Sequence, residues 1–154
     1  MHFDLVDRVL EVSGERIVTV KNITSAEEYL QDHFPTFPVL PGVMMLEAMV
    51  QAARRLLEHI ETGPDRWVLG RVRALKYGRF VKPGATLRVT VTRAKDSDPR
   101  AREFRGEVHL IDPQATAGGA PPEPAIAASG RFSLRPVTLG ATACTGADAV
   151  LAAR

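Results

Sequence analysis

The sequence predicts an α+β fold in which an antiparallel sheet curls around one long helix. Residues from Val43 to about Ile60 have helical periodicity and almost no polar face in their first half, so this helix must be covered by other structure. About six other stretches, on both sides of the helix, are apolar and β-branched as strands are. One long buried helix among such strands is typical of the α+β class.

Two short strands are expected before the helix. Leu5–Leu10 and Ile17–Val20 are apolar, and Ser13-Gly14 between them is a turn signal, so they are predicted to form a hairpin. Thr24 to Glu28 offers a capped start for a short helical turn, because Glu28 follows Ser25 by three residues.

The chain after the helix, which Gly63-Pro64 ends, is predicted to form strands. The clearest is Thr86–Arg93, which follows the turn Pro83-Gly84 and alternates apolar and polar residues with a period of two. Three less regular strands are expected at Trp67–Leu75, Glu103–Ile111 and Ala125–Leu134.

We expect one domain over residues 1–136, since a chain of 154 residues fits a single domain with a real core. Residues 112–124 are rich in Pro, Gly and Ala and are predicted to form a long hairpin loop. Residues 137–154 are a tail rich in small residues, expected to be partly flexible.

Composition excludes several classes of protein. A hydrophobic fraction of 45% and a charged fraction of 25% suit a soluble globular protein, and no stretch has the roughly 18 apolar residues of a membrane span. The only cysteine, Cys144, allows no internal disulfide and no cysteine-type metal site. With no signal peptide visible, a cytoplasmic location is expected.

The net charge of +2 comes mostly from arginines spread along the chain, which does not predict nucleic-acid binding. Such arginines form either a solvated face or a shallow docking surface for an acidic partner, and charge alone does not decide between them.

The most informative stretch runs from His33 to Glu47. A histidine has a usual pKa of about 6.5 and accepts a proton at neutral pH. Prolines at 35, 38 and 41 stiffen the chain that follows it. Gly42 allows close approach of a ligand, and the free amides of Gly42 and Val43 at the helix start suit a developing negative charge on a carbonyl oxygen.

Glu47 lies in the most apolar part of the helix, where burial would favour the uncharged acid. It is therefore expected to be a proton donor or a tightly hydrogen-bonded carboxyl group. A base, an acid and an oxyanion site together suit proton abstraction α to a carbonyl with loss of a group at the β carbon.

The residues from His33 to Gln51 resemble the signature of the FabZ/FabA-type 3-hydroxyacyl-(acyl-carrier-protein) dehydratases, which have the hot-dog fold. The likeness is carried by His33-Phe34-Pro35, Pro38, Pro41-Gly42-Val43, Glu47-Ala48-Met49 and Gln51. It extends to Leu5–Val9 and Val20–Ile23, and more weakly to Lys76-Tyr77 with Pro83-Gly84. Glu47 instead of Asp, with the following Ala48–Gln51, favours the FabZ branch.

The resemblance implies a role for each site residue. His33 would be the base at C2 of an acyl thioester, Glu47 would help the C3 hydroxyl to leave, and the Gly42 amide, with Val43 beside it, would polarise the carbonyl. The residues assigned to substrate binding are Phe34, Pro41, Gln51 and Tyr77.

The resemblance also implies partners. Each site would combine the histidine of one subunit with the carboxylate of another, which requires a homodimer, and trimers of dimers are common in the family. An acidic acyl carrier protein would dock on basic surface near the mouth of the acyl tunnel, and no metal or organic cofactor would take part.

Three alternatives stay open from the residues themselves. Hot-dog thioesterases also use an acid on the central helix, and a non-catalytic acyl-binding or assembly protein could have kept the fold. Glu47 could instead be a structural acid paired with Gln51 or with an arginine. The sequence departs from the family pattern at Asp32 and Thr36, where glycines are usual, and Asp32 adds a carboxylate beside the base.

Overall fold

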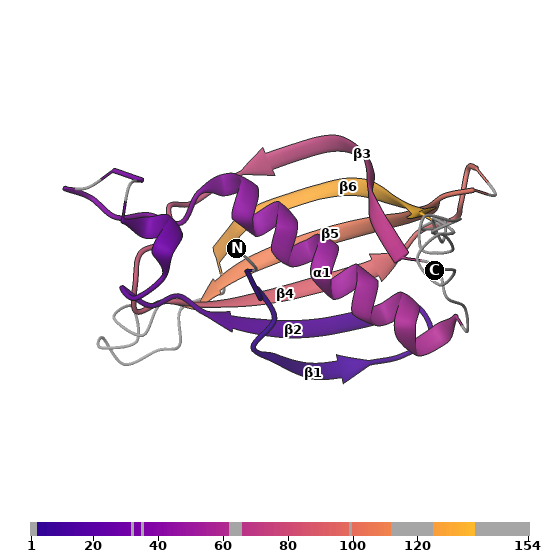
Figure 1. Ribbon diagram of the computed structural model, residues 1–154, viewed down its shortest axis with the longest axis horizontal. Helices are drawn as coiled ribbons and strands as arrows, with labels where there is room; N and C mark the ends of the chain where they lie inside the picture. Colours follow the sequence, from indigo (N-terminus) through magenta and orange to yellow (C-terminus); the bar gives the residue numbers. More distant parts are fainter. Residues whose placement is uncertain are drawn as a thin grey trace, which may run out of the picture.

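The computed structural model describes residues 3–31, 33–34, 36–61, 66–98, 100–111 and 125–137. Its elements are shown in Figure 1 and are, in chain order, β1 (Arg8–Val12), β2 (Arg16–Asn22), the 3-10 helix η1 (Glu28–Leu30), α1 (Gly42–Ile60), β3 (Arg66–Tyr77), β4 (Thr86–Arg93), β5 (Arg102–Ile111) and β6 (Ala125–Val137).

The strands form one six-stranded sheet in the order β1-β2-β4-β5-β6-β3, and every neighbouring pair is antiparallel. The helix α1 lies across one face of this sheet, with β1 and β3 at the two edges (Figure 1). The predicted α+β fold, with a sheet wrapped around one long helix, is confirmed.

The core lies between α1 and the sheet. Strand β4 shows how the sequence positions it, because Leu87, Val89 and Val91 are buried while the residues between them are half-buried or exposed. On α1 the buried side chains are mainly small or flexible: Met45, Ala48, Met49, Val50, Ala52, Ala53, Leu56 and Leu57. Apolar side chains on one face of each element therefore bring the helix onto the sheet.

Element boundaries differ from the predictions in a few places. Strand β4 has the predicted bounds, whereas α1 begins one residue earlier than expected, at Gly42. The hairpin is displaced, since β1 begins only at Arg8. The predicted capping box is wrong, because η1 begins at Glu28 and its N-cap residue, Glu27, makes no side-chain cap.

Some predictions lie outside the described residues. These concern Asp32, the helix stop at Gly63-Pro64, the loop at 112–124, Cys144 and all of the tail except Val137, which still belongs to β6.

Candidate active site

His33 lies in the loop between η1 and α1, and its ring is held in one orientation. The ring Nδ1 is 2.8 Å from the carbonyl oxygen of Val39. A carbonyl oxygen only accepts hydrogen bonds, so Nδ1 carries the proton and Nε2 of the neutral ring keeps a free lone pair. The half-buried His33 is therefore arranged to accept a proton at Nε2.

Phe34 packs edge-on against the His33 ring, with 4.6 Å between ring centroids and an interplanar angle of 70°. Its backbone has φ of 56°, an uncommon conformation for a residue with a side chain. Phe34 is 58% exposed, so it supports one side of the histidine and also meets solvent. Phe34, which was assigned to substrate binding, does not line the pocket that contains His33.

The loop is joined to the segment that follows β3. The Leu40 amide donates to the Val81 carbonyl at 2.8 Å. Nearby, the rings of Phe37 and Phe80 meet edge-to-face at 6.3 Å, and the Lys82 ammonium lies 4.4 Å from the centre of the Phe37 ring. These contacts place residues 77–82 beside the histidine loop.

A pocket of about 440 Å³ opens between these two segments. Five residues that the sequence predicted for the site line it: His33, Pro41, Gly42, Val43 and Tyr77. Apolar side chains supply much of the remaining wall, as expected for a site that receives an acyl chain.

Gly42 lets the half-exposed ring of Tyr77 approach the start of α1 closely. A Cβ atom on Gly42 would lie 2.9 Å from both Cε1 and Cζ of the Tyr77 ring. Pro41 caps the helix without a side-chain hydrogen bond, and the first amide bonded there is that of Met44, which donates to the Pro41 carbonyl at 2.9 Å. Among the described residues, nothing accepts the amide hydrogens of Gly42 and Val43, so both are available to a ligand oxygen.

Glu47 does not line this pocket. Glu47 is the fifth residue after Gly42 in the helix, which turns its side chain about 140° around the helix axis. The predicted burial of Glu47 is wrong for the protomer, since its side chain is 36% exposed. Apolar neighbours in the sequence do not by themselves bury a helical residue, because adjacent residues lie on different sides of the helix.

Two donors hold one oxygen of the Glu47 carboxylate. Gln51 Nε2 donates to Oε1 at 3.2 Å, and Arg54 Nη1 donates to the same oxygen at 3.3 Å. No described residue donates to Oε2. The carboxylate is therefore fixed by Oε1, and Oε2 is free to bind a water molecule or a hydroxyl group.

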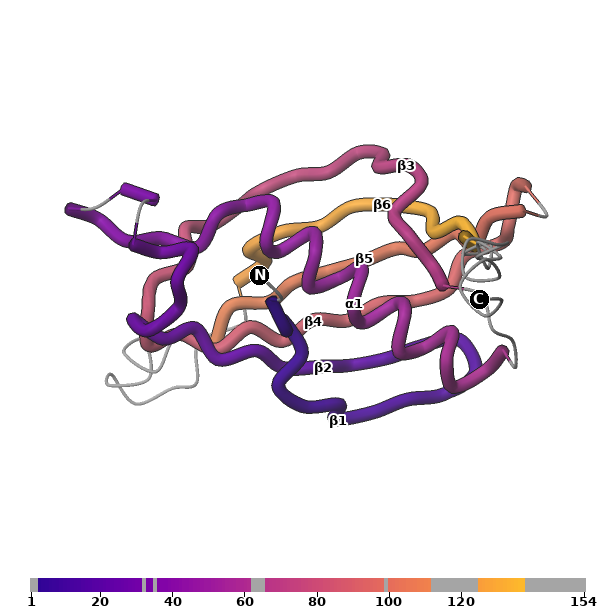
Figure 2. Tube along the Cα trace, in the orientation of Figure 1, coloured from indigo at the N-terminus to yellow at the C-terminus, as the bar shows by residue number. Residues whose placement is uncertain are grey.

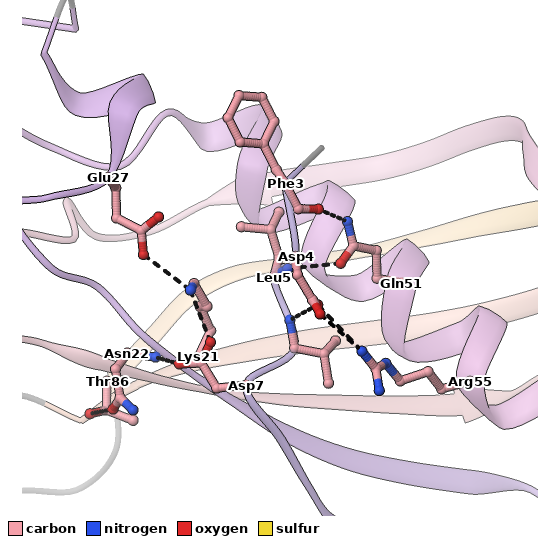
Figure 3. A network of polar contacts seen from close by, with 11 residues as sticks. Phe3, Asp4, Leu5, Asp7, Lys21, Asn22, Glu27, Gln51, Arg55 and Thr86 are labelled. Carbon is pink, nitrogen blue, oxygen red and sulfur yellow. Dashed lines mark hydrogen bonds and ion pairs between the residues drawn. The ribbon is translucent and has the colours of Figure 1, made fainter. Parts of the chain in front are cut away.

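Gln51, which was assigned to substrate binding, lies away from the His33 pocket. Its Oε1 accepts the Leu5 amide at 2.8 Å, and its Nε2 donates to the Phe3 carbonyl at 2.8 Å (Figure 3). The same Nε2 also donates to Glu47. The segment before β1 passes beside α1 at this level (Figure 2). Gln51 is thus oriented by backbone groups and positions Glu47.

Arg54 was not singled out from the sequence. Its Nε donates to the Trp67 carbonyl at 2.8 Å, so the same guanidinium connects Glu47 to the start of β3. The available signal was spacing, because residues seven apart lie on one face of a helix. Glu47 therefore has both partners of the structural alternative, a glutamine and an arginine.

A second polar network fixes the chain that leads to His33. Lys21, only 8% exposed, lies 2.9 Å from Asp7 Oδ1 and 3.0 Å from Glu27 Oε1 (Figure 3). Asp7 also accepts the Asn22 amide at 2.7 Å through Oδ2. Burial alone would lower the pKa of Lys21, but the hydrogen bonds and charges of Asp7 and Glu27 outweigh it and raise that pKa.

Tyr29, two residues after Glu27, packs edge-on against Phe3 with 5.4 Å between ring centroids. Its hydroxyl is buried without a hydrogen-bond partner among the described residues. Burial, with the nearby charges of Glu27 and Asp7, raises the pKa of this hydroxyl well above its usual 10.0. Lys21 and Tyr29 thus hold η1 against the segment before β1.

Metal sites and membrane-spanning helices are two further features that the described residues could contain. No group of three or more His, Cys, Asp or Glu side chains in this part of the chain is arranged to hold a metal ion. Within the same residues, no helix has the length and apolar character needed to cross a bilayer.

Comparison with solved structures defines the class of fold. The chain superimposes on a subunit of the dehydratase heterocomplex ApeI:P from Xenorhabdus doucetiae with a TM-score of 0.58 and 17% identity, over 87% of this chain and 99% of that one. It is similarly close to TTHA0967, a thioesterase superfamily member from Thermus thermophilus, with a TM-score of 0.61 and 15% identity over 83% and 85% of the two chains. Identities this low show the hot-dog fold alone.

Sequence comparison identifies the family. Residues 1–112 match the FabA-like domain. The 3-hydroxyacyl-(acyl-carrier-protein) dehydratase FabZ of Oenococcus oeni is 48% identical over 96 residues, which are 61% of this chain and 69% of the relative. The enzyme of the same name from Streptococcus pyogenes serotype M3 is 36% identical over 84% of each chain. The chain belongs to the FabA-like family, and the predicted FabZ branch is supported.

Proposed function

We propose that this protein is a hydro-lyase that converts a 3-hydroxyacyl thioester to the trans-2-enoyl thioester. The observation that carries the proposal is the pocket that His33 lines together with Gly42 and Val43, whose amide hydrogens no described residue accepts. A base beside an oxyanion site suits removal of a weakly acidic proton next to a thioester carbonyl. Membership of the FabA-like family supports the same reaction.

In this reaction His33 Nε2 takes the proton from C2 while the Gly42 and Val43 amides stabilise the charge that develops on the carbonyl oxygen. The electron pair left at C2 forms the double bond as the C–O bond at C3 breaks. Glu47 gives a proton to the departing hydroxyl, directly or through water held at Oε2, and the proton that His33 took from C2 balances it, so that one water molecule is released. No atom is lost except those of the water.

Each active site is completed by a second subunit, because Glu47 points away from the pocket of its own protomer. The base His33 would act together with the partner subunit's Glu47. A homodimer is also supported by β3, a 12-residue edge strand that, among the described residues, pairs only with β6, so that nothing in this part of the chain covers its other edge. Pairing of two β3 edges would bury these groups.

The thioester is proposed to be carried by an acyl carrier protein, as the names of the two relatives state for those enzymes. Basic side chains near the pocket suit an acidic carrier: Arg79 lines the pocket, and Lys82 lies over Phe37 beside it. An acyl carrier protein as partner is in keeping with the cytoplasmic location that the sequence predicts.

Incubation with a 3-hydroxyacyl thioester and with an enoyl thioester tests the reaction, with absorbance of the conjugated enoyl group and a thiol reagent read in parallel. Interconversion of the two without release of thiol is expected. Release of free thiol would support the thioesterase alternative and contradict the proposal. Absence of either reaction with every carrier and chain length would favour the non-catalytic alternative.

A further inference from the structure

A second cleft, of about 630 Å³, lies over β3, β6 and the loop between β4 and β5. We call it the arginine cleft, since five arginines line it: Arg71, Arg73, Arg100, Arg131 and Arg135. In β6 the neighbours Phe132 and Leu134 are buried in the core, so Arg131 and Arg135 point to the face of the sheet turned away from α1. The cleft therefore opens on the outer face.

Strand register places some of these like charges directly opposite one another. Arg73 of β3 is paired with Arg131 of β6, and Arg131 is paired on its other side with Arg105 of β5. Side chains opposite one another on adjacent strands are close neighbours, and like charges there are destabilising. Three cationic side chains thus share one row across three strands.

The described residues do not neutralise this row within the cleft. None of the four arginines on β3 and β6 forms an ion pair with a described carboxylate: Arg71, Arg73, Arg131 and Arg135. Two acidic residues are nevertheless close enough to share the cleft with them. Those two acids, Asp98 and Glu103, line the same cleft.

Both acids are bonded to their own loop. Asp98 accepts the Arg100 amide at 2.8 Å, and Glu103 accepts the Ser97 hydroxyl. Within the described part of the chain, Arg105 at the far end of the row is the one member with a carboxylate partner, Glu107 at 2.9 Å. The cleft consequently keeps an excess of positive charge.

The chemistry of the lining selects a class of ligand. Guanidinium groups bind phosphate through two parallel hydrogen bonds, and Ser133 adds a hydroxyl donor to the same cleft. Adjacent strands lie about 4.8 Å apart, so neighbouring guanidiniums can hold successive phosphates of one chain. We propose that the arginine cleft binds an oligophosphate group, the chemistry shared by nucleoside triphosphates, coenzyme A and inorganic polyphosphate.

This site is separate from the His33 pocket. Tyr77 and the loop that carries His33 lie at one end of β3, whereas the loop between β4 and β5 lies at the other end of the molecule (Figure 1). The two sites share no lining residue. Oligophosphate binding therefore stands independently of the proposed dehydratase reaction.

Isothermal titration with inorganic tripolyphosphate, ATP and coenzyme A tests the proposal at low and at physiological ionic strength. We expect saturable binding that weakens with salt, and a loss of affinity of at least about tenfold in the double variant Arg73→Gln/Arg131→Gln. Arg88→Gln is the matched control, because Arg88 is exposed on β4, opposite Val20 and His109 and outside the cleft. His33→Ala should leave the binding unchanged, which separates the cleft from binding of coenzyme A at the thioester pocket.

Equal affinity for the three probes would identify the phosphate chain as the ligand, and tighter binding of ATP or coenzyme A would identify that source. Binding of none of them, or binding that the double variant keeps, would overturn the proposal. Removing repulsion should not lower the melting temperature of the double variant at low salt. A second pair, Arg71→Gln/Arg135→Gln, repeats the test if the first fails to fold.

Discussion

Arg54 separates the catalytic reading of Glu47 from the structural one. The variant Arg54→Met removes the 3.3 Å contact with Glu47 Oε1 and the 2.8 Å hydrogen bond to the Trp67 carbonyl. Gln51 would then be the only described donor to the carboxylate. Arg54 acts as a positioning residue in this reading, since it lies outside the pocket.

The substitution Arg54→Met is expected to have a small effect on stability and a large effect on the catalytic rate. The Arg54 and Glu47 side chains are 35% and 36% exposed, so solvent screens the ion pair and it contributes at most about 1 kcal/mol. The bond to Trp67 adds about 1 kcal/mol. The melting temperature should therefore fall by only about 4–8 °C. A carboxylate displaced by about 1 Å could lose on the order of 100-fold in rate.

The assay is steady-state dehydration together with thermal unfolding of Arg54→Met, Arg54→Lys and the control Arg55→Met. Arg55 is exposed, and Asp4 is its only carboxylate partner among the described residues. We expect kcat of Arg54→Met to fall 10- to 100-fold with a smaller change in KM. Arg54→Lys should recover part of it, because the charge is kept. A normal kcat in Arg54→Met, with only the melting temperature lowered, would refute the positioning role.

Three further outcomes are expected. In Gly42→Ala the new Cβ meets the Tyr77 ring, but Tyr77 is 50% exposed and can move. The free energy of unfolding should therefore change by less than about 1 kcal/mol, while KM rises. An unchanged KM would show that the position of Tyr77 is unimportant. Lys21→Met leaves Asp7 and Glu27 without their shared cation and should lower the free energy of unfolding in urea by about 2–4 kcal/mol. A decrease below about 1 kcal/mol would contradict the stabilising role of this network. Because the pKa of Lys21 is raised from 10.5 and that of Tyr29 from 10.0, the folded state keeps protons that the unfolded state releases. Their contribution is complete below about pH 10 and falls as pH rises through the folded values, so unfolding free energy should decline there more steeply in the wild type than in Lys21→Met.

Much of the fold follows from patterns that the sequence displays directly. Period-two alternation sets the bounds of β4, because each inward residue of a half-buried strand must be apolar. The helix was equally visible, because its apolar residues follow helical periodicity and most of them are buried. Local sequence patterns did not predict the start of β1 or the missing cap of η1. For β1 the reason is a contact that is remote in sequence: Leu5 is buried, and its amide donates to Gln51 of α1 instead of joining the sheet.

The candidate site was predictable to the extent that it is contiguous in sequence. His33, Pro41, Gly42 and Val43 are near one another in the chain, and the expectation that they meet in one pocket, with Tyr77, agrees with the structure. Their catalytic roles stay predictions. Arg54 and Lys21 were missed because their partners depend on which helix face and which strand neighbour they meet, and composition does not reveal that.

Complementation between two inactive variants tests the shared active site most directly. His33→Ala and Glu47→Gln are unfolded together, refolded in equal amounts and assayed for dehydration of a 3-hydroxyacyl thioester. Random pairing makes half of the dimers mixed, and each mixed dimer has one site with both His33 and Glu47 intact. We expect the mixture to regain about a quarter of the wild-type activity while each variant alone has almost none. A mixture no more active than its two components would contradict a site built from His33 of one subunit and the partner subunit's Glu47.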